Sequence, residues 1–499
     1  MPETTTPVES QFLPLQNPVM TNSSGWIKGT LLSLTALVLG LLALIVAALL
    51  YIGIPQNAAG MAAKGVCSAA FVAGRPAANL VADDVLPASP VLKLISVDVD
   101  EPSRAVSAKF AGLFKRTAVL LPNRGCVLDA AAGGGPPSPG SKKENVNSPW
   151  PVGDVPVAAS DWGAGVDATT LQKVIDQAFV GAGDPLAANA RGLAIVHKGR
   201  LLALKTAPGF TSQTPLHGWS MTKTITGMLM HKLNTETGLP LGTPVVNAFP
   251  AGREPTWVAD WRGDARKGIK VSDLLYMRDG LASTEDYQPW GSVPKMLWGK
   301  PDAAAFAAAS PQEAAPGTRW RYLSQSANLL SAVARGRFDN DKDYWAYPVK
   351  ALFEPIGANT AVLETDTNGT WVGSSYLWAS VGDWARLGQL MLNDGRWGSA
   401  NETEVLPPGW LQRAKTQSTS TGEGRGYGAQ TWLYGNPQEG TCKGRGLPED
   451  TIAMGGHWGQ VVAMIPSREL VIVRLGWTFD KKQFDSCALI VDVLKALPA

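Results

Sequence analysis

The hydrophobic pattern of the chain opens with one long apolar run. Residues 30–54 contain no charged side chain, and a helix of about 25 residues can cross a bilayer with some tilt. The run is longer than the apolar part of a cleaved signal peptide, and it follows a polar tail, residues 1–25, that is expected to be disordered. An uncleaved transmembrane anchor over residues 26–54, with Trp26 and Tyr51 near its ends, is therefore predicted. A buried core helix is the alternative.

Alternation of apolar and polar residues then predicts a small β-containing extension over residues 55–130. Residues 94–99 and 105–110 alternate on either side of a turn-forming segment, a pattern typical of an antiparallel hairpin. Residues 131–160 include a run of glycine and proline that cannot hold regular structure, so they predict a linker.

The remaining residues, 161–499, have the pattern of one large domain. Short apolar runs separated by turns predict a hairpin near each end, and helical segments fill the middle. Strands from both ends around a helical centre indicate an α+β domain whose sheet is assembled from its two termini. The predicted strands cover residues 192–196, 201–204, 461–465 and 470–475, and the predicted flanking helices cover residues 169–179 and 485–497.

Composition narrows the class of protein. The chain has 499 residues, of which 45% are hydrophobic and 17% are charged, as in a folded globular protein. Its 44 Lys and Arg against 42 Asp and Glu leave a net charge of +2. Because no long basic run is present, nucleic acid is not expected as a partner. Only four histidines occur and none forms a ligand pair, so neither a metal nor an organic cofactor is expected.

Four cysteines, all after the apolar run, bear on the compartment. They form no C-x-x-C pattern, and their even number fits two disulfides on the outer side of a membrane. Charges on the two sides of the run are nearly balanced, so the positive-inside rule does not fix the orientation. Four reduced buried thiols are the alternative. The sequential pairing, one of three connectivities, joins Cys67 to Cys126 and Cys442 to Cys487.

The strongest candidate for chemistry is Ser220. Apolar residues recur after it at helical spacing, at Met221, Ile225 and Met228, so Ser220 begins a buried helix. Lys223 then lies one turn further on the same face. A desolvated lysine can lose its proton and act as a base toward a serine hydroxyl. The free amides at a helix N-terminus favour developing negative charge.

Ser220 also has two less specific interpretations. It is a simple N-cap if Lys223 lies on a solvated face. The same S-x-x-K spacing also occurs at Ser292 and Lys295, where a proline and a loop-like context argue against a buried helix. The choice between Ser220 and Ser292 therefore depends on other segments of the chain.

Two later segments supply further polar groups. Tyr322 and Ser324 form a Tyr-x-Ser on a turn before a helix, and the segment from Gly455 to Gln460 opens the strand at 461–465. A packed tyrosine and a glycine-rich strand entry are the ordinary interpretations of the two segments. The S-x-x-K, the Tyr-x-Ser and the glycine-rich segment occur in this order. Their joint occurrence by chance is much rarer than the occurrence of any one of them.

This combination resembles the serine β-lactamase and penicillin-binding-protein superfamily, in particular the class C-like branch with 6-aminohexanoate-dimer hydrolases and related esterases. The similarity spans residues 165–499. It implies a β-lactamase/transpeptidase-like α+β fold, with an antiparallel sheet flanked by helices and an all-α subdomain. The segments 277–281, 285–287, 373–376 and 426–428 belong to the same similarity.

The resemblance implies roles for single residues. Ser220 would be the acylated nucleophile, Lys223 its proton acceptor, and Tyr322 the group that relays a proton to the leaving atom. The backbone amides of Ser220 and Gln460 would form the oxyanion hole. The substrate-binding residues that the same resemblance implies are Ser324, His457, Trp458, Gly459 and Asp286.

Two positions depart from the superfamily pattern. The chain has Tyr322-x-Ser324 in place of Tyr-x-Asn, and His457-Trp-Gly459 in place of Lys-Thr-Gly. Lysine is a cation suited to a substrate carboxylate, whereas histidine has a reference pKa of about 6.5 and is mostly neutral at pH 7. Efficient β-lactam hydrolysis is therefore not expected.

The predicted function is hydrolysis of an amide or ester bond in a small molecule or short oligomer, through an acyl-enzyme on Ser220. The cysteines and the superfamily's usual location predict a single-pass inner-membrane protein with its catalytic domain on the periplasmic or extracytoplasmic side. The alternative is a membrane-anchored acylation sensor or D-peptidase related to penicillin-binding proteins, and the rate of deacylation separates a sensor from a hydrolase. The natural substrate and the oligomeric state stay open.

Overall fold

The computed structural model divides the chain into two units, Met1–Ile52 and Gly53–Ala499. The predicted N-terminal tail falls almost wholly outside the described residues, as does the glycine- and proline-rich part of the predicted linker. The structure describes residues 24–130, 146–398, 400–418 and 426–498.

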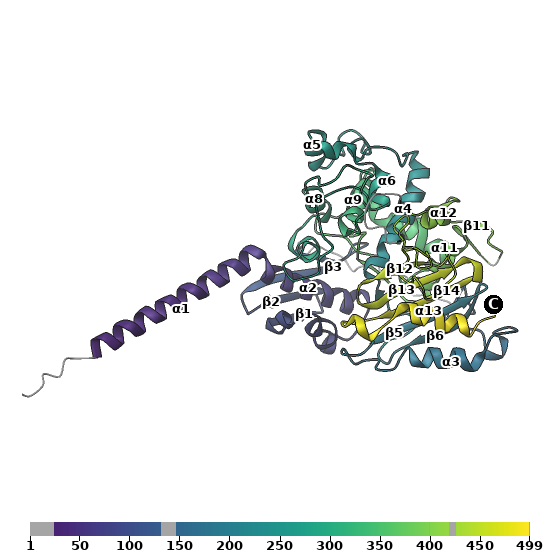
Figure 1. Ribbon diagram of the computed structural model, residues 1–499, viewed down its shortest axis with the longest axis horizontal. Helices are drawn as coiled ribbons and strands as arrows, with labels where there is room; N and C mark the ends of the chain where they lie inside the picture. Colours follow the sequence, from purple (N-terminus) through teal and green to yellow (C-terminus); the bar gives the residue numbers. More distant parts are fainter. Residues whose placement is uncertain (1–23, 131–145, 399, 419–425, 499) are drawn as a thin grey trace, which may run out of the picture. The chain divides into compact units, whose positions relative to one another are not determined.

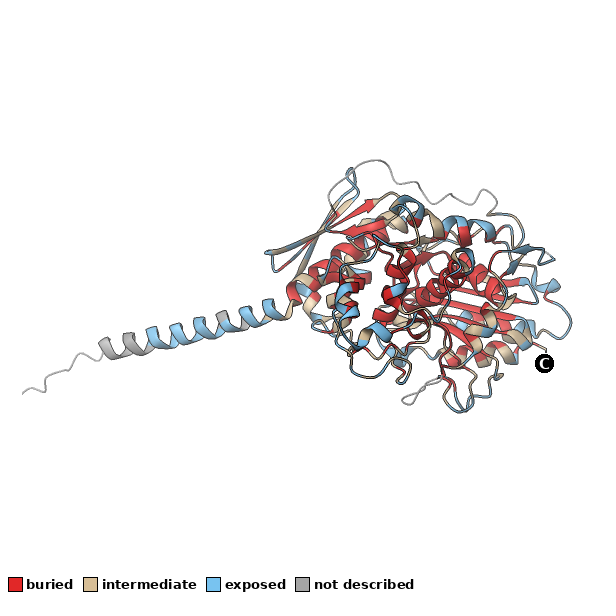
Figure 2. Ribbon diagram, turned by 90° about the horizontal axis from the view of Figure 1, so that it is seen from above, coloured by how far each residue is buried: buried red, intermediate tan, exposed pale blue. Residues whose placement is uncertain are grey.

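The described part of unit 1 is one helix, α1 (Ser24–Ile52). Its segment Leu31–Ile52 is long and apolar enough to cross a membrane, by length and composition only; a signal sequence near an N-terminus passes the same test. In Figure 2 the described residues of this helix have the colour of exposed residues along most of its length. A helix that is apolar on all sides requires burial in protein or in lipid.

A five-stranded sheet lies in unit 2 and is built from both ends of the predicted large domain, residues 161–499. Its strands are β5 (Ala190–His197), β6 (Arg200–Thr206), β12 (Ile452–Gly456), β13 (Gln460–Ile465) and β14 (Leu470–Gly476). They are antiparallel in the order β12-β13-β14-β5-β6, so both predicted hairpins are confirmed. Every residue of β5, β13 and β14 is buried, because helices cover both faces of the sheet.

The covering helices explain the continuous apolar runs of these strands. Helices α3 (Ala168–Gln177) and α13 (Ser486–Lys495) pack on one face, and α11 (Val381–Leu392) packs on the other. Successive strand residues alternate between two cores: Ile195 belongs to the core with α3 and α13, and Val196 to the core with α11. Figure 1 shows α3 and α13 beside β5 and β6.

The helical part of unit 2 is centred on two buried helices that pack against each other, α4 (Thr222–Thr237) and α9 (Ser324–Arg335). Shorter described helices surround them: α5 (Trp257–Arg262), α6 (Val271–Leu275), α7 (Ser292–Pro294), α8 (Ala303–Ala308), α10 (Asp341–Pro348) and α12 (Trp410–Lys415). Short strands complete this part: β7 (Leu216–His217), β8 (Val362–Leu363), β9 (Leu377–Ala379), β10 (Arg396–Trp397) and β11 (Thr403–Glu404).

The extension that opens unit 2 contains a largely buried helix that the sequence pattern did not predict, α2 (Ile54–Cys67). It packs on an antiparallel sheet of order β1-β2-β3-β4. The pairing of the first two strands confirms the predicted hairpin. These strands are β1 (Ile95–Asp100), β2 (Ala105–Phe110), β3 (Phe114–Leu121) and β4 (Gly125–Leu128).

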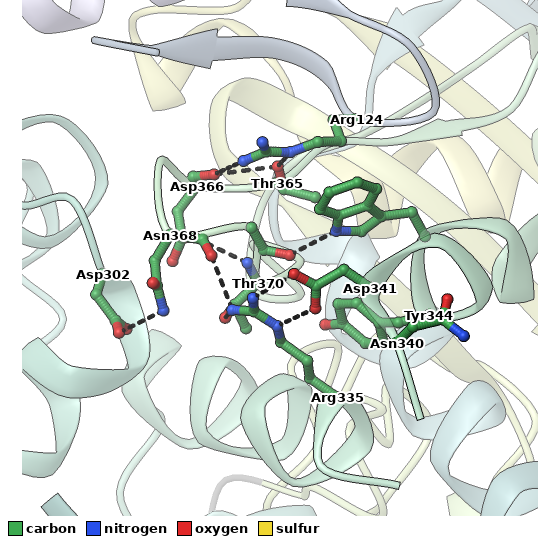
Figure 3. A network of polar contacts seen from close by, with 12 residues as sticks. Arg124, Asp302, Arg335, Asn340, Asp341, Tyr344, Thr365, Asp366, Asn368 and Thr370 are labelled. Atoms are coloured by element: carbon green, nitrogen blue, oxygen red, sulfur yellow. Dashed lines mark hydrogen bonds and ion pairs between the residues drawn. The ribbon is translucent and has the colours of Figure 1, made fainter. Parts of the chain in front are cut away.

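Polar contacts join this extension to the large domain of unit 2. Lys64 Nζ lies 2.6 Å from Glu364 Oε2, and both side chains are buried. Figure 3 shows Arg124, on the turn between β3 and β4, donating to Thr365 Oγ1 at 2.9 Å and to the carbonyl of Asp366 at 2.9 Å. The extension and the large domain therefore share one compact unit.

Both disulfides have the sequential pairing, so that connectivity is confirmed. Cys67–Cys126 joins the end of α2 to β4. Cys442–Cys487 joins the loop before β12 to the first turn of α13.

Candidate active site

Ser220 lies where the chain passes from β7 into the central helix α4. A 3-10 turn, Trp219–Met221, leads directly into that helix. Gly456, the last residue of β12, crosses this turn so closely that a Cβ atom there would lie 2.3 Å from the carbonyl oxygen of Gly218. Only glycine permits this approach, which brings the end of β12 beside Ser220.

Lys223 is the partner of Ser220. Its Nζ lies 2.8 Å from Ser220 Oγ, 2.9 Å from Ser324 Oγ and 3.0 Å from the carbonyl oxygen of Ser374. Burial lowers the pKa of Lys223 to about 8, although the negative charge of Glu285 raises it. An amine with this pKa can accept a proton near neutral pH. The predicted Ser-Lys pair is thus brought together inside the protein.

Two tyrosines flank Ser220. Burial raises the pKa of both Tyr287 and Tyr322, and the charge of Glu285 adds to the effect; a hydrogen bond of each phenol with Ser220 acts in the opposite direction. Both phenols therefore stay protonated at neutral pH. The ring of Tyr322 stacks on Trp432 with 4.9 Å between centroids, which fixes its position.

Glu285 is a site residue that sequence analysis missed. Its carboxylate accepts hydrogen bonds from the Ser324 amide at 2.7 Å and from the Ser324 hydroxyl at 2.6 Å. Ser324 is fully buried and hydrogen bonds to both Glu285 and Lys223, so it links these two side chains and has no exposed surface for a substrate.

Asp286, which the resemblance placed among the substrate-binding residues, is not among the described residues that line the pocket. Its Oδ1 accepts from the amide of Gln288 at 2.9 Å, and its carbonyl accepts from the amide of Val293 at 3.2 Å. Asp286 therefore shapes its own loop. The adjacent acids at 285 and 286 are visible in the sequence, but which of them faces inward depends on the path of this loop.

A pocket of about 630 Å³ opens at Ser220. Its charged residues, among those described, are Glu285, Glu439 and Lys481. His457 stacks on Tyr287 with 4.2 Å between ring centroids. Burial, with the charge of Lys481 adding to it, lowers the pKa of His457 to about 3, so its imidazole is neutral. Further lining residues are Tyr322, Trp432, Tyr434, Thr441, Gly459, Gln460, Thr478, Phe484 and Ser486.

The His457-Trp458-Gly459 segment differs from the expected strand opening, because it forms a 3-10 turn between β12 and β13. Trp458 has a φ of 58° and packs on Trp477 with 4.7 Å between ring centroids. It lines a small inner cavity and is not among the described residues of the pocket at Ser220. The left-handed backbone of Trp458 thus turns the indole inward, away from the predicted substrate position.

Gln460 holds this turn in place with its side chain. Its Nε2 donates to the carbonyl oxygens of His457 at 3.0 Å, Trp458 at 3.0 Å and Gly476 at 2.6 Å. Gln460 itself lines the pocket together with Ser220. The two residues whose amides were expected to form an oxyanion hole therefore share one pocket.

The competing serine, Ser292, has a different environment. Its hydroxyl donates to the carbonyl oxygen of Thr284. Ser292 is not among the described residues that line the pocket. Among the described residues, no group of three or more His, Cys, Asp or Glu side chains is arranged to hold a metal ion.

The fold and the site together define a class of proteins. The fold is an antiparallel sheet flanked by helices, and the site has a serine and a buried lysine at the start of the central helix. The family model described as beta-lactamase matches residues 168–488, and the chain belongs to this family. The resemblance to the serine β-lactamase and penicillin-binding-protein superfamily is thereby confirmed.

Solved structures share this fold. A protein from Bacillus anthracis, assigned as a 6-aminohexanoate-dimer hydrolase, has a TM-score of 0.51 and 18% identity, covering 66% of this chain and 83% of its own. A protein from Bacteroides dorei, assigned as a β-lactamase, has a TM-score of 0.51 and 17% identity, covering 66% of this chain and 98% of its own. At these identities the likeness concerns the fold alone. A comparison with curated proteins finds no match.

Proposed function

We propose that the protein is a serine hydrolase that cleaves amide or ester bonds through an acyl-enzyme on Ser220. The observation that carries the proposal is the 2.8 Å contact between Ser220 Oγ and Lys223 Nζ. Because burial brings the pKa of Lys223 to about 8, a useful fraction of the amine is neutral near pH 7. Such an amine can take the hydroxyl proton as the serine attacks.

The proposed reaction has two halves. Ser220 Oγ attacks the carbonyl carbon, its proton passes to Lys223, and the amides of Ser220 and Gln460 hold the oxyanion. The bond to the leaving nitrogen or oxygen breaks as Tyr322 donates a proton, which Lys223 replaces. Water then attacks the acyl ester, the carboxylic acid leaves, and Ser220 regains its proton.

We propose that the substrates are esters and amides that carry no charge where they contact His457, which lines the pocket. With a pKa of about 3, His457 offers a substrate carboxylate no charge at neutral pH. His457→Lys should raise kcat/KM for a cephalosporin relative to a neutral p-nitrophenyl ester by roughly ten-fold, because charge-assisted hydrogen bonds are about twice as strong as neutral ones. An unchanged ratio, or a wild-type enzyme as fast on the cephalosporin as on its best ester, would contradict this role.

We also propose a single-pass anchor at α1 with unit 2 on the extracytoplasmic side. The apolar segment Leu31–Ile52 supports the anchor. The two disulfides support the side, since disulfides persist in oxidising compartments. Reporter fusions at the C-terminus test the side, and a cytoplasmic C-terminus would overturn it.

Covalent labelling of the full chain by a fluorophosphonate tests the nucleophile. Ser220→Ala should abolish labelling, whereas the matched control Ser292→Ala should label like the wild type. Labelling lost only in Ser292→Ala would identify the other serine. Rapid-quench measurements then compare acylation with deacylation, and an acyl-enzyme that forms without turnover would favour the acylation sensor.

A further inference from the structure

Six exposed residues gather at the end of unit 2 where α2 begins. We name them the entry surface. They are Lys93, Leu94, Lys109, Leu113, Lys115 and Trp290.

Contacts with the first turn of α2 bring the apolar members together. Asn57 Nδ2 donates to the carbonyl of Pro289 at 3.1 Å, which places Trp290 next to this turn. Arg116 Nη1 donates to the carbonyl of Gln56 at 3.4 Å and belongs to β3, just after the hairpin tip that carries Leu113.

Leu94, the third apolar member of the entry surface, lies beside the same hairpin tip. The amide of Ala111 donates to the Leu94 carbonyl, so Leu94 lies at this end of the small sheet. Trp290, Leu94 and Leu113 are 52%, 55% and 77% exposed, values that are unusual for three large apolar side chains at one end of a sheet and helix.

The lysines of the entry surface lie at the same end of the small sheet. Lys109 of β2 is paired directly with Lys115 of β3, and Lys93 precedes Leu94. Two exposed acids of β1 lie toward its other end, where Asp98 pairs with Ser107 and Asp100 with Ala105, and the exposed Asp129 after β4 forms an ion pair with Arg116. Like charges directly opposite each other destabilise an antiparallel pair, so this pairing calls for a negatively charged partner.

The position of the entry surface in the chain identifies the partner. Unit 2 begins at Gly53, one residue after the apolar segment Leu31–Ile52 ends. Gln56 and Asn57, which contact the entry surface elements, therefore follow the end of that segment by only a few residues. Exposed Trp and Leu beside lysines are the side chains that enter the interface of a bilayer with anionic headgroups.

We propose that the entry surface rests on the anionic surface of the bilayer that α1 crosses. This inference rests on the membrane anchor of the proposed function. It also concerns the pocket, because Pro289 and Trp290 belong to the loop that carries Glu285 and Tyr287. The pocket loop is thus bonded to the part of unit 2 that meets the membrane.

Fluorescence of the full chain in lipid vesicles tests the proposal. Leu113→Cys, labelled with a polarity-sensitive fluorophore, is reconstituted into phosphatidylcholine vesicles containing phosphatidylglycerol and brominated lipid. The label should shift its emission to shorter wavelength and be quenched roughly three-fold or more beyond the control, as expected for side chains at the headgroup boundary. The control is Val180→Cys, which is 66% exposed and follows α3. Figure 1 shows α3 at the end of unit 2 away from α2.

A charge variant tests the choice of lipid. Changing the three entry-surface lysines to Glu should remove the part of the quenching that depends on phosphatidylglycerol. The matched control changes three exposed lysines elsewhere to Glu and should keep that part. These control lysines are Lys173, Lys198 and Lys495.

Three outcomes would overturn the proposal: equal signals from the labels at positions 113 and 180, no effect of the entry-surface charge reversal, or a chain that does not remain with the vesicles. The measurements are made in a Ser220→Ala background, so they do not depend on hydrolysis. A protein that passes this test but shows no labelling or turnover would lose the hydrolase proposal and keep the membrane surface.

Discussion

Lys223 is subject to two opposing influences at the scale of single residues. Burial removes water from its ammonium group and lowers the pKa to about 8, while the charge of Glu285 raises it. Lys223 and Glu285 both hydrogen bond to Ser324, which holds the Glu285 carboxylate at a fixed position relative to the Lys223 amine. The acid therefore adjusts the pH range over which the lysine can accept a proton.

Glu285→Gln should move the acidic limb of the kcat/KM profile to lower pH. The substitution removes the charge that raises the pKa of Lys223, so this pKa falls below about 8 and the neutral amine persists at lower pH. The limb reports protonation of the base in the free enzyme. Glu439→Gln is the control, because Glu439 lines the pocket but is not among the groups that shift Lys223. A limb that stays in place or rises would exclude this role.

The effect of Tyr322→Phe should depend on the leaving group. An amide nitrogen needs a proton to leave, so kcat/KM for an anilide should fall by roughly 100-fold or more. A p-nitrophenolate leaves without a proton, and the loss on that ester should be much smaller. Tyr287→Phe is the comparison, since both phenols hydrogen bond to Ser220. Equal losses on the two substrates in Tyr322→Phe would argue against a proton relay there.

The sequence identifies the site residues that local geometry determines. Ser220 and Lys223 lie one helical turn apart, so their contact follows from spacing alone. Glu285 reaches the site from a loop whose path depends on distant contacts, such as the bond from Asn57 to Pro289. No periodicity in the sequence encodes that path. For the same reason the sequence could not choose between the two neighbouring acids.

At the scale of elements, the close crossing of β12 over the Ser220 turn is the sharpest constraint. Gly456→Ala should lower kcat/KM by roughly 10-fold to 100-fold, because its Cβ would meet the Gly218 carbonyl at 2.3 Å and the backbone must shift. The fold should survive, since one end of one strand can yield. The control is Gly242→Ala, where a Cβ meets no atom within 4 Å. Unchanged activity in Gly456→Ala would show that the turn tolerates the shift.

The elements differ in how well the sequence predicts them. The hairpins β5–β6 and β13–β14 follow from short apolar runs bounded by turns, which is local information. Helix α2 does not follow from a local pattern. It is buried around most of its surface and therefore lacks the polar stripe of an amphipathic helix. It packs against strands β2 and β3 and against the helical turn Lys295–Gly299, and neither contact can be read from its own sequence.

At the scale of the whole molecule, the ion pair of Lys64 and Glu364 joins the extension to the large domain. Lys64→Met should lower the free energy of unfolding by about 3 kcal/mol, because it leaves a buried carboxylate without its cation. Lys64→Met combined with Glu364→Gln should recover much of that loss, since Gln carries no charge and can still accept from Cys126 N. Denaturant unfolding of unit 2 measures both. A double variant less stable than the single one would contradict the account.

The disulfide Cys442–Cys487 determines when the pocket at Ser220 can take its final form. Its two cysteines directly follow Thr441 and Ser486, which both line the pocket. A newly made chain in a reducing compartment would lack this disulfide, which joins two segments that line the pocket. With the proposed extracytoplasmic placement of unit 2, the pocket would be completed only after export, and the proposed hydrolase activity would not act on esters and amides of the cytosol.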